Sequence, residues 1–200
     1  MFFACLKSII IQDYFRKHSV QNSSIGFVCE GTKAISSQAD ADAIGAACPT
    51  FTGNIVLADG PLYSTVTLDG MKEITGDLTT HDWMTIRIPS LERIGGVFKN
   101  QNPYTVTVEL PKLTYVGAGI LFTETDAMRP GLQYLRMPSL VEVNGSFIAT
   151  GNHYFSELQI PSLERINGLF KIADEFGLFD LSADKLESVG PGGIELAGSF

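Results

Sequence analysis

The sequence lacks any cluster of basic residues. Lys and Arg total 14 against 22 Asp and Glu, which gives a formal net charge of −8 at pH 7. A nucleic-acid-binding surface needs grouped cations that displace phosphate counterions, so we do not expect DNA or RNA as a partner. The sequence also has no uninterrupted run of about 18 apolar residues, and it therefore contains no predicted transmembrane helix.

Motifs that would indicate catalysis or a cofactor are also missing. There is no GxxxxGK phosphate-binding loop, and the three histidines lie far apart without a recognisable Ser or Cys nucleophile arrangement. Two acidic pairs, Glu124 with Asp126 and Asp174 with Glu175, stand in segments of variable length. Neither pair recurs in neighbouring repeats, as carboxylates lining a solenoid enzyme would, so we interpret them as solvated loop charges. The sequence predicts neither an enzyme nor a bound cofactor or metal.

Cysteine is scarce, with residues at Cys5, Cys29 and Cys48 only. Cys29 and Cys48 bracket the start of the regular part of the chain, and a disulfide between them would stabilise a small secreted fold by roughly 2–4 kcal/mol. Two unpaired buried thiols are the alternative. A zinc site is not expected, because neither CxxC nor a suitably spaced histidine accompanies these cysteines.

A repeated motif organises most of the chain, and its period decides the fold. The pattern is apolar-x-apolar-Pro-Ser-Leu-x-x-apolar-x-Gly-x-apolar. The clear copies are residues 86–98 (IRIPSLERIGGVF), 108–120 (VELPKLTYVGAGI), 135–147 (LRMPSLVEVNGSF) and 158–170 (LQIPSLERINGLF), with weaker copies at 66–78 and 179–194. The prolines of the clear copies are 22, 27 and 23 residues apart, so each unit has one fixed part and one loop of variable length.

The first half of the motif predicts a short strand that ends at a corner. Ile86 and Ile88, with one polar residue between them, place two apolar side chains on one face of a strand. Pro89 cannot donate a hydrogen bond to a sheet and therefore marks the end of that strand. After the corner, Leu91 and Ile94 point inward again, and the two residues between them face water.

The second half predicts a bend at a glycine, followed by a strand that begins with an inward phenyl ring. The glycines are Gly76, Gly96, Gly145 and Gly168, and the rings are Phe98, Phe147 and Phe170. We expect the bend to need a backbone conformation that a side chain would hinder. One unit cannot cover its own apolar face, so successive units must stack and share one interior.

The expected fold class is all-β: a right-handed parallel β-helix, or β-solenoid, with a short N-terminal capping helix. An antiparallel sandwich is the alternative, but its hairpins would not require Pro-Ser-Leu at the same phase of every unit. A leucine-rich repeat matches the unit length but not the signature. The helix is expected at residues 36–48, where it covers the edge of the first coil. Its expected cap is Ser36 or Ser37, and its expected packing residues are Ala39, Ala43, Ile44 and Ala47.

The order of the cysteine pair, the helix, the segment 52–55 (TGNI) and the repeats resembles a known family. It is similar to the fungal GPI-anchored cell-wall organisation proteins with receptor L-domain-like repeats, which are distantly similar to the L domains of insulin-type receptors. The resemblance covers roughly residues 29–200. It implies a secreted, non-catalytic glycoprotein of the cell wall or the outer face of the plasma membrane, which contributes to wall organisation and integrity.

The two ends of the chain depart from this resemblance. We expect residues 1–28 to be a degenerate signal-like or disordered segment, because Lys7 and Ser8 interrupt the apolar stretch that a secretory signal requires. A misassigned first exon or an ordinary amphipathic segment are alternatives. The sequence ends at Phe200, inside a repeat and without the hydrophobic tail of a GPI signal, so we expect the solenoid domain, residues 29–200, to be truncated.

The candidate surface sites are two sequons and several loops that contain aromatic residues. Asn22 and Asn144 each begin an N-glycosylation sequon, although Asn144 also suits a turn with a left-handed backbone. The loops supply four candidate ligand-contact residues: Trp83, Tyr104, His153 and Tyr154. Such side chains stack on sugar rings or anchor protein partners, and they also serve as covers over the side of a stack.

Three functions remain open from the sequence. The leading hypothesis is a structural or interaction module of the fungal cell surface, with wall glycan or surface proteins as partners. The second is a receptor-like module with a defined protein or glycan ligand. The third is a carbohydrate-active β-helix enzyme.

Overall fold

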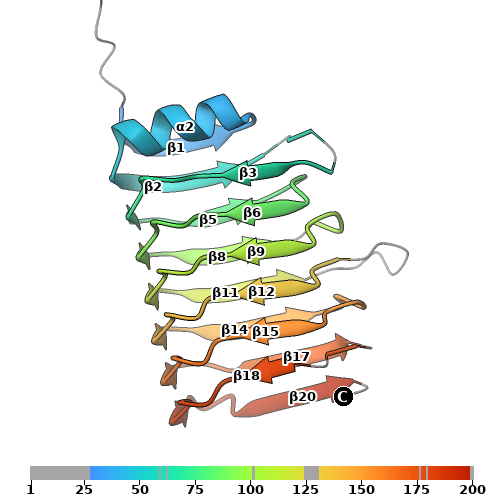
Figure 1. Ribbon diagram of the computed structural model, residues 1–200. Coiled ribbons are helices and arrows are strands. Elements are labelled where there is room, and N and C mark those ends of the chain that lie inside the picture. Colours follow the sequence, from blue (N-terminus) through green and yellow to red (C-terminus); the bar gives the residue numbers. More distant parts are fainter. Residues whose placement is uncertain are drawn as a thin grey trace, which may run out of the picture.

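The computed structural model describes residues 28–58, 60–61, 63–100, 102–123, 131–175, 177–178 and 180–198. These residues form a parallel β-solenoid of about seven turns with a single short helix, which confirms the expected fold class. The coils stack in chain order, from α2 (Gln38–Ala47) at one end to β20 (Ile194–Gly198) at the other (Figure 1). Within these ranges, no helix has the length and hydrophobicity needed to cross a membrane.

The strands of the coils form three faces of the stack. Face A consists of β1 (Glu30–Ile35), β2 (Thr50–Leu57), β5 (Leu78–Thr80), β8 (Val97–Asn100), β11 (Gly119–Thr123), β14 (Ser146–Thr150), β17 (Phe170–Glu175) and β20. Face B starts from the first residues of β2 and continues through β4 (Glu73–Ile74), β7 (Arg93–Ile94), β10 (Tyr115–Val116), β13 (Glu142–Val143), β16 (Arg165–Ile166) and β19 (Ser188–Val189). Face C is a six-stranded sheet of β3 (Thr65–Thr67), β6 (Thr85–Arg87), β9 (Thr107–Glu109), β12 (Tyr134–Arg136), β15 (Glu157–Gln159) and β18 (Asp180–Ser182).

Equivalent positions of the repeat lie over one another. On face C, Ile86 pairs with Val108 in parallel register, and the same row continues through Leu135 and Leu158. The leucines that follow the prolines share one turn, in which the leucine N–H donates to the carbonyl oxygen three residues earlier. These buried residues are Leu91, Leu113, Leu140 and Leu163. The prediction that successive Pro-Ser-Leu units share one interior is therefore confirmed.

The phenyl rings lie in the interior as expected. Phe98, Phe147 and Phe170 are all buried. Phe147 and Phe170 meet edge to face, with ring centroids 5.4 Å apart, and Phe98 meets Phe122 in the same way at 5.1 Å. Edge-to-face pairs add a small attraction to the burial of apolar area, so aromatic contacts link successive coils along the stack.

The glycines of the motif are required by the neighbouring coil and not by their own backbone conformation, which corrects our expectation. None of Gly76, Gly96, Gly145 and Gly168 has a positive φ. A Cβ on Gly145 would lie 1.8 Å from the carbonyl oxygen of Ala118, and one on Gly76 would lie 2.6 Å from that of Gly53. The chain passes so close to the previous coil at this corner that no side chain fits.

Helix α2 is capped by Ser37, one of the two expected residues. The Ser37 side chain accepts a hydrogen bond from the backbone N–H of Asp40, and the Asp40 carboxylate stands in the first turn, where the helix dipole favours negative charge. The packing face differs from the prediction, because Ala41, Ile44 and Gly45 are buried while Ala39 and Ala47 are exposed. The helix therefore packs on the face with spacing i, i+3, i+4, and Gly45 lets it approach the carbonyl oxygen of Asp69.

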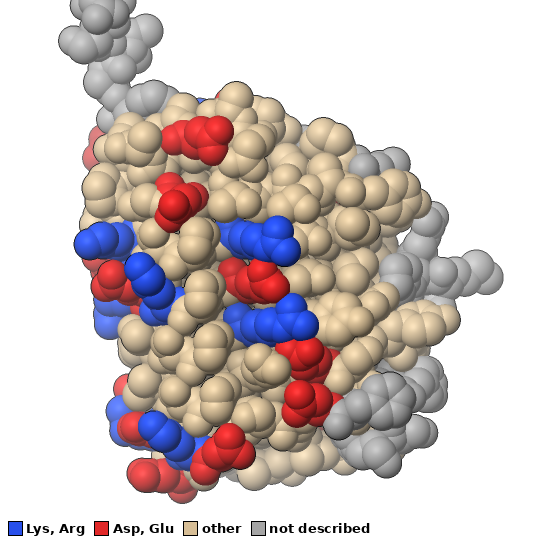
Figure 2. Space-filling model, in the orientation of Figure 1, with Lys and Arg blue, Asp and Glu red and all other residues tan. Residues whose placement is uncertain are grey.

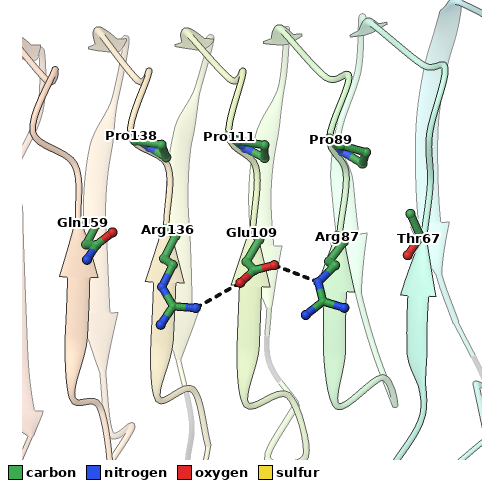
Figure 3. A pocket seen from close by; sticks show the side chains of 8 residues that line it. All are labelled: Thr67, Arg87, Pro89, Glu109, Pro111, Arg136, Pro138 and Gln159. Carbon is green, nitrogen blue, oxygen red and sulfur yellow. Dashed lines mark hydrogen bonds and ion pairs between the residues drawn. The ribbon is translucent and has the colours of Figure 1, made fainter.

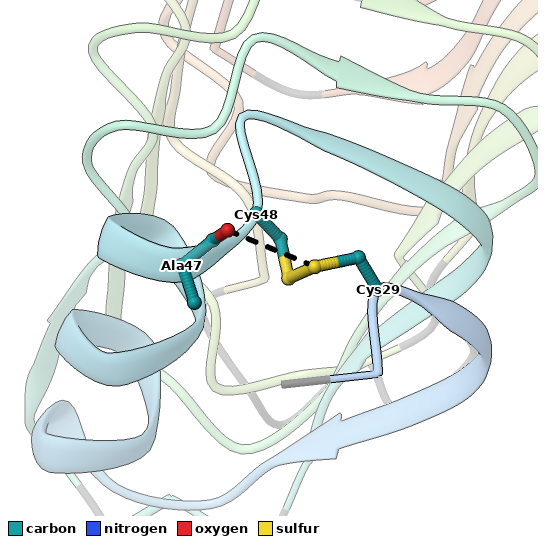
Figure 4. Close-up of a disulfide and its surroundings, with 3 residues drawn as sticks. All are labelled: Cys29, Ala47 and Cys48. Carbon is teal, nitrogen blue, oxygen red and sulfur yellow. Dashed lines mark hydrogen bonds between the residues drawn. A yellow bond between two sulfur atoms is a disulfide. The ribbon is translucent and has the colours of Figure 1, made fainter. Parts of the chain in front are cut away.

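A disulfide ties the helix to the first strand. Cys29 and Cys48 are bonded with their Cα atoms 5.6 Å apart, which confirms the predicted pairing. Figure 4 shows the bond beside the last turn of α2, where Sγ of Cys29 lies 3.7 Å from the carbonyl oxygen of Ala47. The pairing closes the segment that holds β1 and α2, so the cap is fixed at both of its ends.

Candidate functional site

Trp83 is part of the core, so its prediction as a ligand-contact residue is wrong. Only 1% of its surface is exposed, and a Cβ on Gly60 would lie 2.3 Å from its ring. The physical reason is its place in the coil. Trp83 stands two residues before β6, and the equivalent residues of the next coils are also buried: Thr105, Leu132 and Phe155. Trp83 covers the interior at this level of the stack.

The other three loop candidates lie at the surface to different extents. Tyr154 is 58% exposed, whereas Tyr104 and His153 are half-buried. Tyr104 belongs to the loop between β8 and β9, and the other two belong to the loop between β14 and β15. The loop of the intervening coil includes residues 124–130, which lie outside the described residues.

The polar residues of these loops hold the loops in place. The Asn102 side chain donates to Oδ1 of Asp82 at 2.7 Å, and its own Oδ1 accepts the backbone N–H of Tyr104 at 2.7 Å. Asn152 is buried, and its amide donates to the carbonyl oxygens of Phe122 and Thr150. Asparagines that bond to nearby backbone stabilise turns. These side chains therefore have a structural role in the loops.

Asn144 is exposed, as an acceptor of a glycan must be. Its φ is not positive, so the alternative of a left-handed turn residue is wrong. Oδ1 of Asn144 accepts a hydrogen bond from Nδ2 of Asn167 at 2.8 Å, which pairs equivalent asparagines of two coils. Its use as a glycosylation site stays a prediction, and the other sequon, Asn22, lies outside the described residues.

The two acidic pairs are interpreted from the sequence as solvated loop charges, and this interpretation stays a prediction. Glu124 and Asp126, and the side chains of Asp174 and Glu175, lie outside the described residues. Among the side chains that are described, no group of three His, Cys, Asp or Glu is placed to hold a metal ion.

A groove on face C is the candidate site that the described residues form. Its volume is about 320 Å³, and it is lined by Thr67, Arg87, Pro89, Glu109, Pro111, Arg136, Pro138 and Gln159. Figure 3 shows the three proline rings in one row and the five polar side chains in a second row beside it. The polar row comes from the last residues of β3, β6, β9, β12 and β15. The stacking of the coils thus builds a long groove with one apolar and one polar side.

The charged side chains of the groove pair with one another. Nε of Arg87 donates to Oε2 of Glu109 at 2.7 Å, and a terminal nitrogen of Arg136 donates to Oε1 of the same carboxylate at 2.9 Å. Arg136 also makes a two-pronged contact with Glu157, at 2.5 and 2.9 Å. Charges of opposite sign alternate along this part of the stack (Figure 2). Two arginines and two glutamates therefore form a ladder without net charge, which we call the charge ladder.

The ladder shifts the acidity of its members. Hydrogen bonds, first from Arg87 and then from Arg136, lower the pKa of Glu109 below its ordinary value of 4.5. The contacts with Glu157 and Glu109 raise the pKa of the Arg136 guanidinium. Both groups are therefore charged at neutral pH. A general acid at neutral pH needs a carboxyl whose pKa is raised, so Glu109 is unsuited to that role.

Arg87→Ala is expected to cost more stability at pH 6 than at pH 3. The pKa of Glu109 is lowered in the folded state, so its ion pair stabilises the fold above the ordinary carboxyl pKa of 4.5 and loses this effect as pH falls through the folded value. We expect at most about 1 kcal/mol, since Arg87 is half-exposed. Urea unfolding at both pH values measures the difference. Lys185→Ala, an exposed charge, is the control, and an equal cost of Arg87→Ala at both pH values would contradict the prediction.

The sequence contains a signal for this groove that loop composition did not reveal. In the motif apolar-x-apolar-Pro, the variable residue is Arg87, Glu109, Arg136 or Gln159 in the four clear repeats. Each stands between two buried neighbours, and the prolines that follow Arg87, Glu109 and Arg136 line the groove with them. Alignment of the repeats alone places these polar residues in one row.

Comparisons with protein-family models, with curated proteins and with solved structures find no match to this chain.

Proposed function

We propose that this chain is a non-catalytic module of the fungal cell surface that binds wall polysaccharide and contributes to wall organisation and integrity. The order of cysteine pair, capping helix and repeats supports this proposal through its resemblance to fungal cell-wall organisation proteins. The disulfide is compatible with an extracellular protein, because such bonds persist in oxidising compartments. A location in the wall or on the outer face of the plasma membrane, and N-glycosylation, belong to the same proposal.

The observation that carries the proposal is the chemistry of the groove on face C. A catalytic pair of carboxylates needs one group that donates a proton to the leaving group. The other group either takes a proton from water or attacks the sugar as a nucleophile. In the groove, Glu109 is instead held ionised between Arg87 and Arg136. A fixed ladder of donors and acceptors beside an apolar wall is suited to recognition.

Incubation of the full chain with insoluble wall polysaccharide tests this function. We expect the protein to sediment with the polysaccharide in a saturable manner. We also expect no new reducing ends and no unsaturated products, with calcium or without it. Product release that grows with time would instead show a carbohydrate-active enzyme. If the protein stays in the supernatant with every wall fraction, it is not a polysaccharide-binding module.

A further inference from the structure

We propose that the groove on face C binds a neutral, extended polysaccharide whose chain runs parallel to the axis of the solenoid. This inference rests on the proposed function and adds to it the site and the class of ligand. It follows from three properties of the groove: its repeat along the stack, its lack of net charge, and the pairing of its central strands, β6, β9 and β12, on both sides.

The groove repeats once per coil. Its polar row comes from five successive strands of face C, and the prolines that line it follow β6, β9 and β12. Neighbouring strands lie about 4.8 Å apart, so the polar row extends over roughly 19 Å. A linear polymer laid along this direction meets one polar side chain at each step, and a proline ring at three of them. Repeated contacts of this kind favour a ligand that is built of repeating units.

The polar row favours hydroxyl groups over charged groups. The positive charges of Arg87 and Arg136 are balanced by Glu109 and Glu157, so a polyanion or polycation gains little net attraction. Donors and acceptors alternate along the row, and a hydroxyl group both donates and accepts.

Several donors of the groove also remain available to a ligand. Of the three guanidinium nitrogens of Arg87, only Nε has a partner among the described residues. Both terminal nitrogens are therefore available to a ligand. The Arg87 side chain is 50% exposed. The Gln159 amide, at the other end of the row, has no described protein partner either. Arg87 and Gln159 thus present unengaged donors on either side of Glu109 and Arg136.

The apolar wall complements a sugar ring. Pro89, Pro111 and Pro138 present ring carbons along one side of the groove. A sugar ring carries hydroxyl groups at its rim and C–H groups on its faces, so it contacts both rows at once. Burial of such apolar area is favourable, and the gain adds up over several coils.

A peptide ligand fits this groove less well. Peptides that add a strand to a sheet need a free edge, but β6, β9 and β12 are each paired on both sides. Proline-rich peptides dock into grooves lined by aromatic rings, and the lining residues include none. The observations therefore favour polysaccharide over peptide.

Co-sedimentation of the full chain with insoluble β-1,3-glucan and with chitin tests the site. We expect Arg87→Ala combined with Gln159→Ala to weaken binding to at least one of these glycans about tenfold or more, since both free donors are lost. Pro111→Asp, which puts a charge into the apolar wall, is expected to act in the same direction. Arg165→Ala on face B, which removes an exposed arginine paired with Glu142, is the matched control and should bind like the wild type. Each variant is compared by its urea midpoint, so that only folded protein is scored.

The possible outcomes distinguish a failure of the groove as the binding site from a failure of the proposed function. If the wild type binds a glycan and both groove variants bind it equally well, the groove is not the site, while the proposed function stands. If the wild type binds neither these glycans nor whole wall fractions, the proposed function itself fails. Binding to polygalacturonate or to a proline-rich peptide, lost in the groove variants, would overturn the neutral polysaccharide as the ligand.

Discussion

Phe147→Ala is expected to lower the free energy of unfolding by about 3–5 kcal/mol. Phe147 is fully buried in the middle of the stack, and its ring contacts that of Phe170 in the next coil. Its strand, β14, is paired on both sides, with β11 and with β17. These strands hold the backbone in place, so the cavity left by the ring cannot collapse.

Urea unfolding followed by circular dichroism measures this cost. Tyr154→Ala is the matched control, since Tyr154 is 58% exposed and its truncation should change stability by no more than about 0.5 kcal/mol. Coils of a solenoid contact only their neighbours, so the cavity also weakens the coupling between the two halves of the stack. A broader transition for Phe147→Ala would report this second effect. Equal midpoints for the two variants would contradict the packing described above.

Removal of the disulfide by Cys29→Ala with Cys48→Ala is expected to cost about 2–4 kcal/mol. The two cysteines are 19 residues apart, and the bond restricts the unfolded chain over that segment. The segment holds β1 and α2, which cover the end of the hydrophobic interior. Loss of the bond should therefore expose the first coil to local unfolding before the rest of the stack.

A reducing agent provides the control for this prediction. Dithiothreitol should lower the urea midpoint of the wild type to that of the double variant, and it should leave the double variant unchanged. Hydrogen exchange should become faster in β1 and α2 while the central strands keep their protection. If reduction leaves the wild type as stable as before, the disulfide does not hold the cap in place.

The repeat made the fold predictable from the sequence. Proline and leucine at a constant phase fix the corner of each coil, and alternation around Arg87 or Glu109 fixes which side chains face inward. The spacing of Cys29 and Cys48 likewise indicates a disulfide-bound cap, although spacing alone leaves two free thiols as an alternative. Each of these signals is local, so the sequence carries it directly.

The loop residues are harder to predict, because the loops differ in length between repeats. Trp83 stands three residues before the first apolar residue of its motif, and the same position holds Thr105, Leu132 and Phe155 in the next coils, all of them buried. Thr105 interrupts this otherwise apolar column, so the position does not stand out from the loop beside it. The role of the motif glycines was misjudged for a related reason. Contact between Gly145 and the carbonyl oxygen of Ala118 joins residues that are neighbours only after the coils have stacked.

The charge ladder also favours the correct pairing of coils during folding. All coils have similar apolar interiors, so a coil that skipped its neighbour would still bury its leucines. Pairing β6 directly with β12 would place Arg87 beside Arg136, and like charges on adjacent strands are unfavourable. The native order instead sets Glu109 between them. The alternation of sign thus disfavours misassembly of a repetitive chain, independently of any ligand.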